Sequence, residues 1–130
     1  MTPMQQLFLG QGGKKSTYID DVFSSYVYTG NETARSINNS INLSGEGGLV
    51  WTKCRSGASA MSHFLFDTER GVTKSLITNL ADGEGNDTNF ITSFNANGYN
   101  LGTSGYVNEN NSTFASWSFR RASGFFDCVE

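Results

Sequence analysis

Two acidic residues on one predicted strand are the first candidates for chemistry. Asp67 and Glu69 stand two positions apart in the sequence, so a strand would place both carboxyl groups on one side, roughly 6 to 7 Å apart. Glycoside hydrolysis uses two carboxyl groups at about 5 to 9.5 Å. Arg70 follows directly and offers an ion-pair partner. We therefore expect a structural role for this pair and no enzymatic activity.

Other chemistry-bearing residues do not form a recognisable catalytic set. His63 is the single histidine, and no Gly-x-Ser-x-Gly motif accompanies it. Cys54 and Cys128 lie in predicted strands without a Cys-x-x-Cys context, which predicts free, buried thiols and no zinc site. We expect the chain to hold no metal and no cofactor.

An acidic loop offers oxygen ligands, the kind that calcium prefers. Its polar side chains are Asp82, Glu84, Asp87 and Asn89. Their spacing differs from that of an EF-hand loop. The sequence favours a solvated loop and leaves calcium binding as the alternative.

Aromatic and amide side chains near predicted loop tips could bind a sugar. An aromatic face can stack on a pyranose ring, and amide groups can hydrogen-bond its hydroxyls. The candidates for carbohydrate binding are Tyr99, Tyr106, Asn108 and Asn110. The same residue types also form ordinary turns, so both interpretations stay open.

Composition limits the partner classes. The 130 residues suit one domain, and only 16% are charged, with a net charge of -3. Scattered Lys and Arg residues and this negative charge argue against nucleic-acid binding. No apolar run is long enough to span a membrane, so membrane insertion is not expected.

The strands that would position these residues are short and separated by Gly- and Asn-rich turns. Among these turns, Asn97-Gly98 is the strongest hairpin signal. About eight strands at roughly ten-residue spacing predict an all-β fold, an antiparallel β-sandwich or jelly roll. They are expected at 22–28, 35–43, 49–55, 61–70, 72–80, 90–94, 99–101 and 115–120, with a final strand from Phe125. That last strand could open a second module of a longer chain or complete the sheet beside the first strand. The segment 72–80 is ambiguous, because its apolar spacing fits a helix as well as a strand, and its short length favours the strand. The predicted shared core consists of Trp51, Phe64, Phe66, Trp117 and Phe119.

An arm, residues 1–20, precedes the predicted domain at 21–130. Its apolar cluster, Leu7, Phe8 and Leu9, is followed by a Gly-rich tether. We expect this cluster to dock onto a partner, or else to fold back on the domain.

Five stretches together resemble a module repeated in virion proteins of tailed marine bacteriophages. They are YTGN at 28–31, GLVWTK at 48–53, FLFDTERG at 64–71, TSFNANGYNLG at 92–102 and ASWSFRRASGFFD at 115–127. Those proteins are mostly tail fibres or host-recognition components with a concanavalin A-like (laminin G-like) sandwich. The Glu-x-Asp-x-x-Glu pattern of glucanases with that fold is missing here.

The resemblance implies a structural protein of the virion, located in the bacteriophage tail. The chain would be the N-terminal part of a tail fibre that attaches to the particle and supports host recognition, with residues 1–20 as the attachment segment. Expected partners are tail or adaptor proteins, other copies in a homotrimer and a host surface glycan. The alternatives are a carbohydrate-binding lectin domain and a capsid or head decoration protein.

Overall fold

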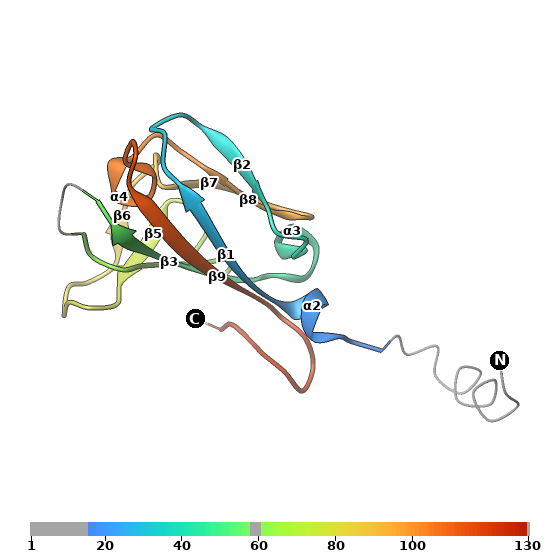
Figure 1. Cartoon of the computed structure of the whole chain (residues 1–130). Helices are drawn as coiled ribbons and strands as arrows, with labels where there is room; N and C mark the ends of the chain where they lie inside the picture. The colour runs from blue at the N-terminus through green and yellow to red at the C-terminus, as the bar shows by residue number, and fades with distance from the viewer. Residues whose placement is uncertain (1–15, 58–60, 130) are drawn as a thin grey trace, which may run out of the picture.

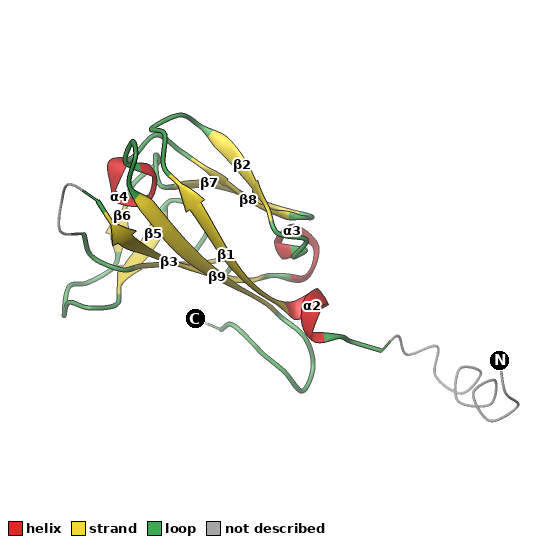
Figure 2. Cartoon of the chain, in the orientation of Figure 1, coloured by secondary structure: helices red, strands yellow, loops and turns green. Residues whose placement is uncertain are grey.

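The computed structural model describes residues 16–57 and 61–129. Strands dominate, and three short helices interrupt them within these ranges (Figures 1 and 2). The helices are α2 (Ile19–Val22), α3 (Leu43–Glu46) and α4 (Gly105–Asn108). The strands are β1 (Phe23–Thr29), β2 (Arg35–Asn38), β3 (Gly48–Ser56), β4 (Phe64–Asp67), β5 (Lys74–Ile77), β6 (Gly85–Asn86), β7 (Ile91–Asn95), β8 (Gly98–Leu101) and β9 (Thr113–Arg120). The described residues contain no helix that is long and apolar enough to cross a membrane.

The strands form two antiparallel sheets. The larger sheet has the order β1-β9-β3-β4-β5-β6, and the smaller has the order β2-β8-β7. The two sheets lie on opposite sides of the apolar core, as Figure 1 shows. The prediction of an all-β, antiparallel fold is confirmed.

The core fills the space between the inner faces of the two sheets. The smaller sheet contributes Ile37, Ile91, Tyr99 and Leu101, all almost fully buried. The larger sheet contributes Tyr28, Val50, Phe64, Phe66 and Phe114. Burial of this apolar surface, at about 25 cal/mol per Å², is the main force that holds the two layers together.

Three of the five predicted core residues lie elsewhere. Phe64 and Phe66 are buried as expected, whereas Trp51, Trp117 and Phe119 are outside the buried core cluster. Side chains alternate along a strand, so the burial of Val50, Thr52 and Ser116 directs the neighbouring tryptophans to the opposite side. The β9 residues that we expected in the core, Trp117 and Phe119, therefore lie on the side of the sheet that faces away from the core.

Small polar residues of β9 face the core because large side chains of other elements need the space. Ser116 and Ser118 are both fully buried. The hydroxyl of Tyr99, from the smaller sheet, hydrogen-bonds the Ser116 hydroxyl at 2.6 Å. Asn39 Nδ2 donates to Ser118 Oγ at 2.9 Å. These bonds compensate for burying the polar groups, so serine is tolerated inside the sandwich-like arrangement.

Two local predictions have opposite outcomes. The ambiguous segment 72–80 contains β5, which confirms the strand interpretation. The final strand predicted from Phe125 is wrong, because the chain turns back at Gly124 (φ 78°) and forms only one bridge, between Ala122 and Phe126. The position beside β1 is therefore not taken by this segment.

The predicted hairpin at Asn97-Gly98 is confirmed. β7 and β8 pair across it, with Asn95 opposite Gly98. Gly98 has φ of 147°, and a Cβ atom there would lie 1.9 Å from the carbonyl oxygen of Ile37. Only glycine lets β2 approach this closely.

Substitution of Gly98 tests this close approach. Gly98→Ala is expected to lower the free energy of unfolding by more than about 1 kcal/mol, because the methyl group meets backbone atoms of β2. Urea denaturation measures the change. The control is Gly83→Ala, since a Cβ atom at Gly83 would have no neighbour within 4 Å. Equal stability of the two variants would contradict the steric argument.

Candidate functional site

The side of the larger sheet that faces away from the smaller sheet is rich in apolar side chains. We call this side the outer face and define it by the apolar residues of its strands, which are Phe23, Val27, Leu49, Trp51, Leu65, Leu76, Ala115, Trp117 and Phe119. Two of them are well exposed, Val27 at 60% and Trp51 at 36%. Exposed apolar side chains that lie close together often mark a contact site for a partner.

Strand register brings the aromatic residues of the outer face together. Trp51 of β3 pairs directly with Trp117 of β9, and their ring centroids are 5.4 Å apart with a 51° tilt. Trp51 Nε1 donates a hydrogen bond to Thr78 Oγ1 at 3.2 Å. On the next row, Phe119 lies 5.1 Å from Phe23 between ring centroids. Neighbouring rings fix one another, so the face presents a preorganised surface.

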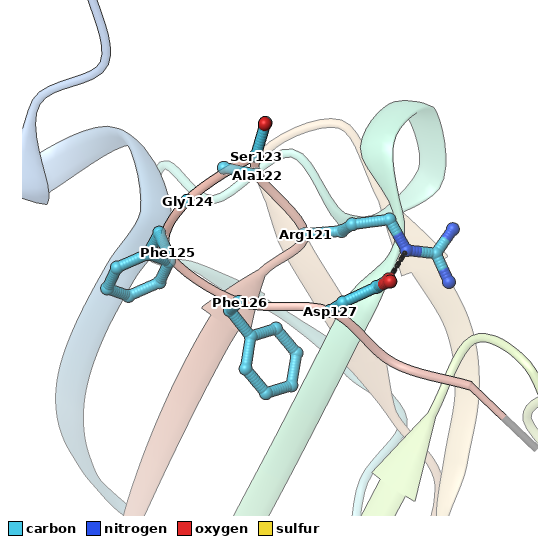
Figure 3. Close-up of a pocket in the computed structure, with 7 residues that line it drawn as sticks. All are labelled: Arg121, Ala122, Ser123, Gly124, Phe125, Phe126 and Asp127. Carbon is cyan, nitrogen blue, oxygen red and sulfur yellow. Dashed lines mark ion pairs between the residues drawn. The ribbon is translucent and has the colours of Figure 1, made fainter.

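The end of the chain covers one part of this face. We call residues 121–128 the C-terminal turn, and Figures 1 and 2 show it running along the outer side of the larger sheet. Phe126 packs on Phe119, with 5.6 Å between ring centroids. Phe125, by contrast, is 43% exposed and points the other way in Figure 3. The turn thus continues the apolar surface beyond the strands.

Arg121 anchors the C-terminal turn. Its Nε lies 2.8 Å from Asp127 Oδ1, an ion pair shown in Figure 3. Its Nη2 donates to Glu69 and, at 2.5 Å, to the carbonyl oxygen of Cys128. The hydrogen bond to Glu69 raises the pKa of the Arg121 guanidinium above its ordinary value. The Arg121 side chain therefore joins the C-terminal turn to the loop that follows β4.

A hollow of about 600 Å³ lies inside the C-terminal turn and is lined by residues 121–127. Arg121 and Asp127 supply its charged groups, and they bind each other (Figure 3). The two phenylalanines of the turn diverge, so they do not form two walls around a ligand. The hollow offers no convergent polar groups of the kind that small-molecule sites need.

The structure separates the two candidate carboxylates, Asp67 and Glu69. β4 ends at Asp67, so Glu69 belongs to the following turn. Asp67 is buried in an ion pair with Arg70, and its Oδ1 accepts the Arg70 backbone N–H at 2.8 Å. Glu69 pairs with Arg121. Each carboxylate is held by an arginine, as expected for structural groups.

The remaining chemical candidates also have local partners. In the acidic loop, Glu84 lies 3.4 Å from both Arg70 Nε and Lys74 Nζ. Asp87 Oδ1 accepts the backbone N–H of Asn89 at 2.7 Å. Across residues 16–57 and 61–129, no group of three or more His, Cys, Asp or Glu side chains could hold a metal ion.

The single histidine and the two cysteines are the last of the chemical candidates from the sequence. His63 bonds through its backbone to Thr78 and Asn79. Cys54 and Cys128 are free and half-buried. Cys128 lies in the C-terminal turn, so its predicted place in a strand is wrong. Burial raises the pKa of both thiols, which keeps them protonated and weakly nucleophilic near neutral pH.

The four predicted sugar-binding residues are divided between core and surface. Tyr99 and Asn108 are fully buried, which corrects their expected placement at loop tips. Asn108 hydrogen-bonds Asn31, Thr33 and Gly102 and so ties three loops together. Tyr106 is 57% exposed, and Asn110 is also exposed. The predicted docking cluster Leu7, Phe8 and Leu9 lies outside the described residues.

The pair Trp51 and Trp117 was missed as a surface feature in the sequence. One signal could have found it. Buried Ser116 and Ser118 alternate with large residues along β9, and Thr52 alternates with Trp51 along β3. Two neighbouring strands thus carry small polar residues on one face, where large side chains from an opposing layer can fit.

Alkaline titration tests the burial of Tyr99. Burial raises the pKa of this phenol well above its ordinary value of 10.0. Above about pH 10 the unfolded chain releases the proton while the folded chain retains it, so the free energy of unfolding should fall as pH rises. Tyr99→Phe should lessen this fall and cost about 1 kcal/mol at neutral pH, where the Ser116 hydrogen bond is lost. Urea unfolding at several pH values measures both, and an unchanged alkaline slope would contradict the argument.

Loss of the Arg121 anchor should free the C-terminal turn without unfolding the sheets. We expect Arg121→Gln to speed amide hydrogen exchange across residues 121–128, because the contacts to Glu69, Asp127 and Cys128 are lost. Exchange in β9 and β3 should stay slow, since their ladders are intact. The control is Arg55→Gln at the exposed end of β3. Unchanged exchange in the turn would show that Phe126 alone holds it.

Comparison with known proteins gives one match. Residues 18–126 match the family model described as Domain of unknown function (DUF7483). No curated protein and no solved structure matches the chain. The matched residues include both sheets, the whole outer face and most of the C-terminal turn. The chain therefore belongs to the DUF7483 family.

Proposed function

We propose that this chain is a non-enzymatic structural protein of a bacteriophage virion. In this proposal it forms the N-terminal part of a tail fibre, which attaches to the particle and supports host recognition. Its two sheets would be a jelly-roll sandwich of the concanavalin A-like type. The proposal combines the five sequence stretches that resemble phage virion modules with the character of the outer face.

The apolar outer face is the observation that carries the proposal. Its strands carry exposed Trp51 and Val27 and partly exposed Trp117, and strand pairing and the contact between the two tryptophan rings hold them in place. Removing such a surface from water against a protein partner lowers the free energy of the system, which favours association. Assembly into a particle uses this kind of contact.

The state of the acidic groups supports a role without catalysis. A general acid or base must be within reach of a substrate and must exchange its proton during the reaction. Asp67 is buried beneath Arg70, and Glu69 is bound by Arg121. Substrate would have to displace these arginines before either carboxylate could act.

A lectin domain is the alternative that one observation favours. Tyr106 exposes more than half of its surface, and its ring contacts Phe90 and Phe64 with centroids 5.7 and 5.6 Å away. A ring supported from behind can stack on a sugar with little loss of side-chain entropy.

A capsid or head decoration protein would use the outer face in the same way as a fibre.

Particle association tests the proposal. The double variant Trp51→Lys/Trp117→Lys should reduce incorporation into purified virions at least about tenfold, because two buried charges would oppose the contact. Immunogold labelling locates the chain on tail or head, and mass spectrometry of the particles measures its amount. Circular dichroism confirms that the variants stay folded.

Tyr106→Ser is the matched control, since it removes an exposed aromatic residue from another part of the molecule. Incorporation of this variant should equal that of the unmodified chain. Binding to a glycan array that Tyr106→Ser abolishes, together with no presence in virions, would favour the lectin. Labelling on the head instead of the tail would favour the decoration protein.

A further inference from the structure

The strand β1 (Phe23–Thr29) forms one edge of the larger sheet, and its outward backbone groups lack a strand partner. β1 pairs with β9 on one side, and no described strand follows it on the other. We propose that this edge pairs with β1 of a second copy of the chain, in antiparallel orientation across a two-fold axis. Two six-stranded sheets would then become one continuous sheet.

The sequence of β1 lacks the usual protection of an edge strand. Natural edges are kept from pairing by charges, proline, bulges or short length. β1 has seven residues, FSSYVYT, with no charged residue, no proline and no glycine. Segments of this length, with high β-propensity and no charge, pair readily with other strands.

The other edges in the described sheets carry such protection. β6 has two residues, and Glu84 and Asp87 flank it. β2 has four residues and begins with the charged Arg35. β7 has a register irregularity between Ile91 and Ser93 that interrupts its ladder with β8. β1 alone among these four edges is long, regular and neutral, which is the property expected of an edge that is paired in the assembly.

The side chains of β1 on the side of the outer face are exposed, so a second strand can approach this edge. Val27 is 60% exposed, and Ser25 and Thr29 are also exposed. Val27 lies opposite Ala115 of β9, so it continues the outer face up to the edge itself. The C-terminal turn packs at the Phe119 end of β9, away from Val27. Pairing would therefore join the outer faces of two copies into one apolar surface.

A two-fold axis through Tyr26 gives a register in which like faces meet. Ser25 would lie opposite Val27 of the second copy, and Phe23 opposite Thr29. All four side chains point to the side of the sheet that carries the outer face, so the pleats of the two strands match. Within β1 no like charges come together, because the strand has none. The segment is thus compatible with itself, which is why the proposed occupant is a second copy.

The inference does not rest on the proposed virion function, since the edge is the same whatever the chain does. It differs from the homotrimer that the sequence resemblance implies, because isologous pairing of β1 closes after two copies. The two other occupants to be excluded are the arm, through Leu7, Phe8 and Leu9, and a strand of a different protein.

Sedimentation equilibrium of the 130-residue chain tests the inference. We expect a dimer with twice the 14.2 kDa of one chain. Val27→Lys should weaken the dimer at least about tenfold, because each copy places a lysine on the pairing edge. The side chain of Val27 points to solvent, so thermal unfolding should change little. Leu80→Lys, at an exposed apolar residue distant from β1 in sequence and sheet order, should leave the dimer intact.

Hydrogen exchange supplies a second measurement. Amides of β1 should become protected as the concentration rises, whereas those of β6 should not. The triple variant Leu7→Ser/Phe8→Ser/Leu9→Ser of the 130-residue chain should still form the dimer. Four results would overturn the inference: a monomer at about 100 μM, a trimer, a dimer unaffected by Val27→Lys, or loss of the dimer in the triple variant. The last result would assign the edge to the arm. None of these results bears on particle association through Trp51 and Trp117.

Discussion

The pairing of β9 with β1 on one side and β3 on the other is the constraint on which the rest of the structure depends. This ladder places Trp117 beside Trp51 and puts Phe119 between Phe23 and Leu49. Because side chains alternate, the same register turns Ser116 and Ser118 inward. Two surfaces of different chemistry therefore arise from one strand, a hydrogen-bonded inner face and an aromatic outer face.

The second sheet decides which of these surfaces is buried. Its Tyr99 reaches across the core to Ser116, and its other large residues fill the space above Val50 and Phe114. The smaller sheet covers one side of the larger one, and among the described residues the C-terminal turn covers part of the outer face. Val27 and Trp51 stay exposed there because no second layer of the described chain packs on them.

Several charged and amide side chains of the described residues make structural contacts with neighbouring groups. Asp67, Glu69 and Glu84 have cationic partners, and buried Asn108 satisfies three loops through hydrogen bonds. Paired carboxylates and satisfied amides have little to gain from a ligand that must first displace their partners. The outer face and the edge of β1 are the two surfaces on which our proposals for an assembly role rest.

The sequence by itself determined the all-β class, most strand positions, the Asn97-Gly98 hairpin and the presence of Arg70 as an ion-pair partner beside the two carboxylates Asp67 and Glu69. These features depend on local propensity, turn chemistry and short sequence spacing, which can be recognised from the amino-acid sequence alone. Only the tertiary structure decided that Trp51, Trp117 and Phe119 face outward, that Tyr99 and Asn108 are buried and that the chain after Arg121 forms a turn. Strand alternation separates residues into two faces but does not say which face meets the other sheet. That choice depends on the packing of Tyr99 and its neighbours against small serines from a strand distant in sequence.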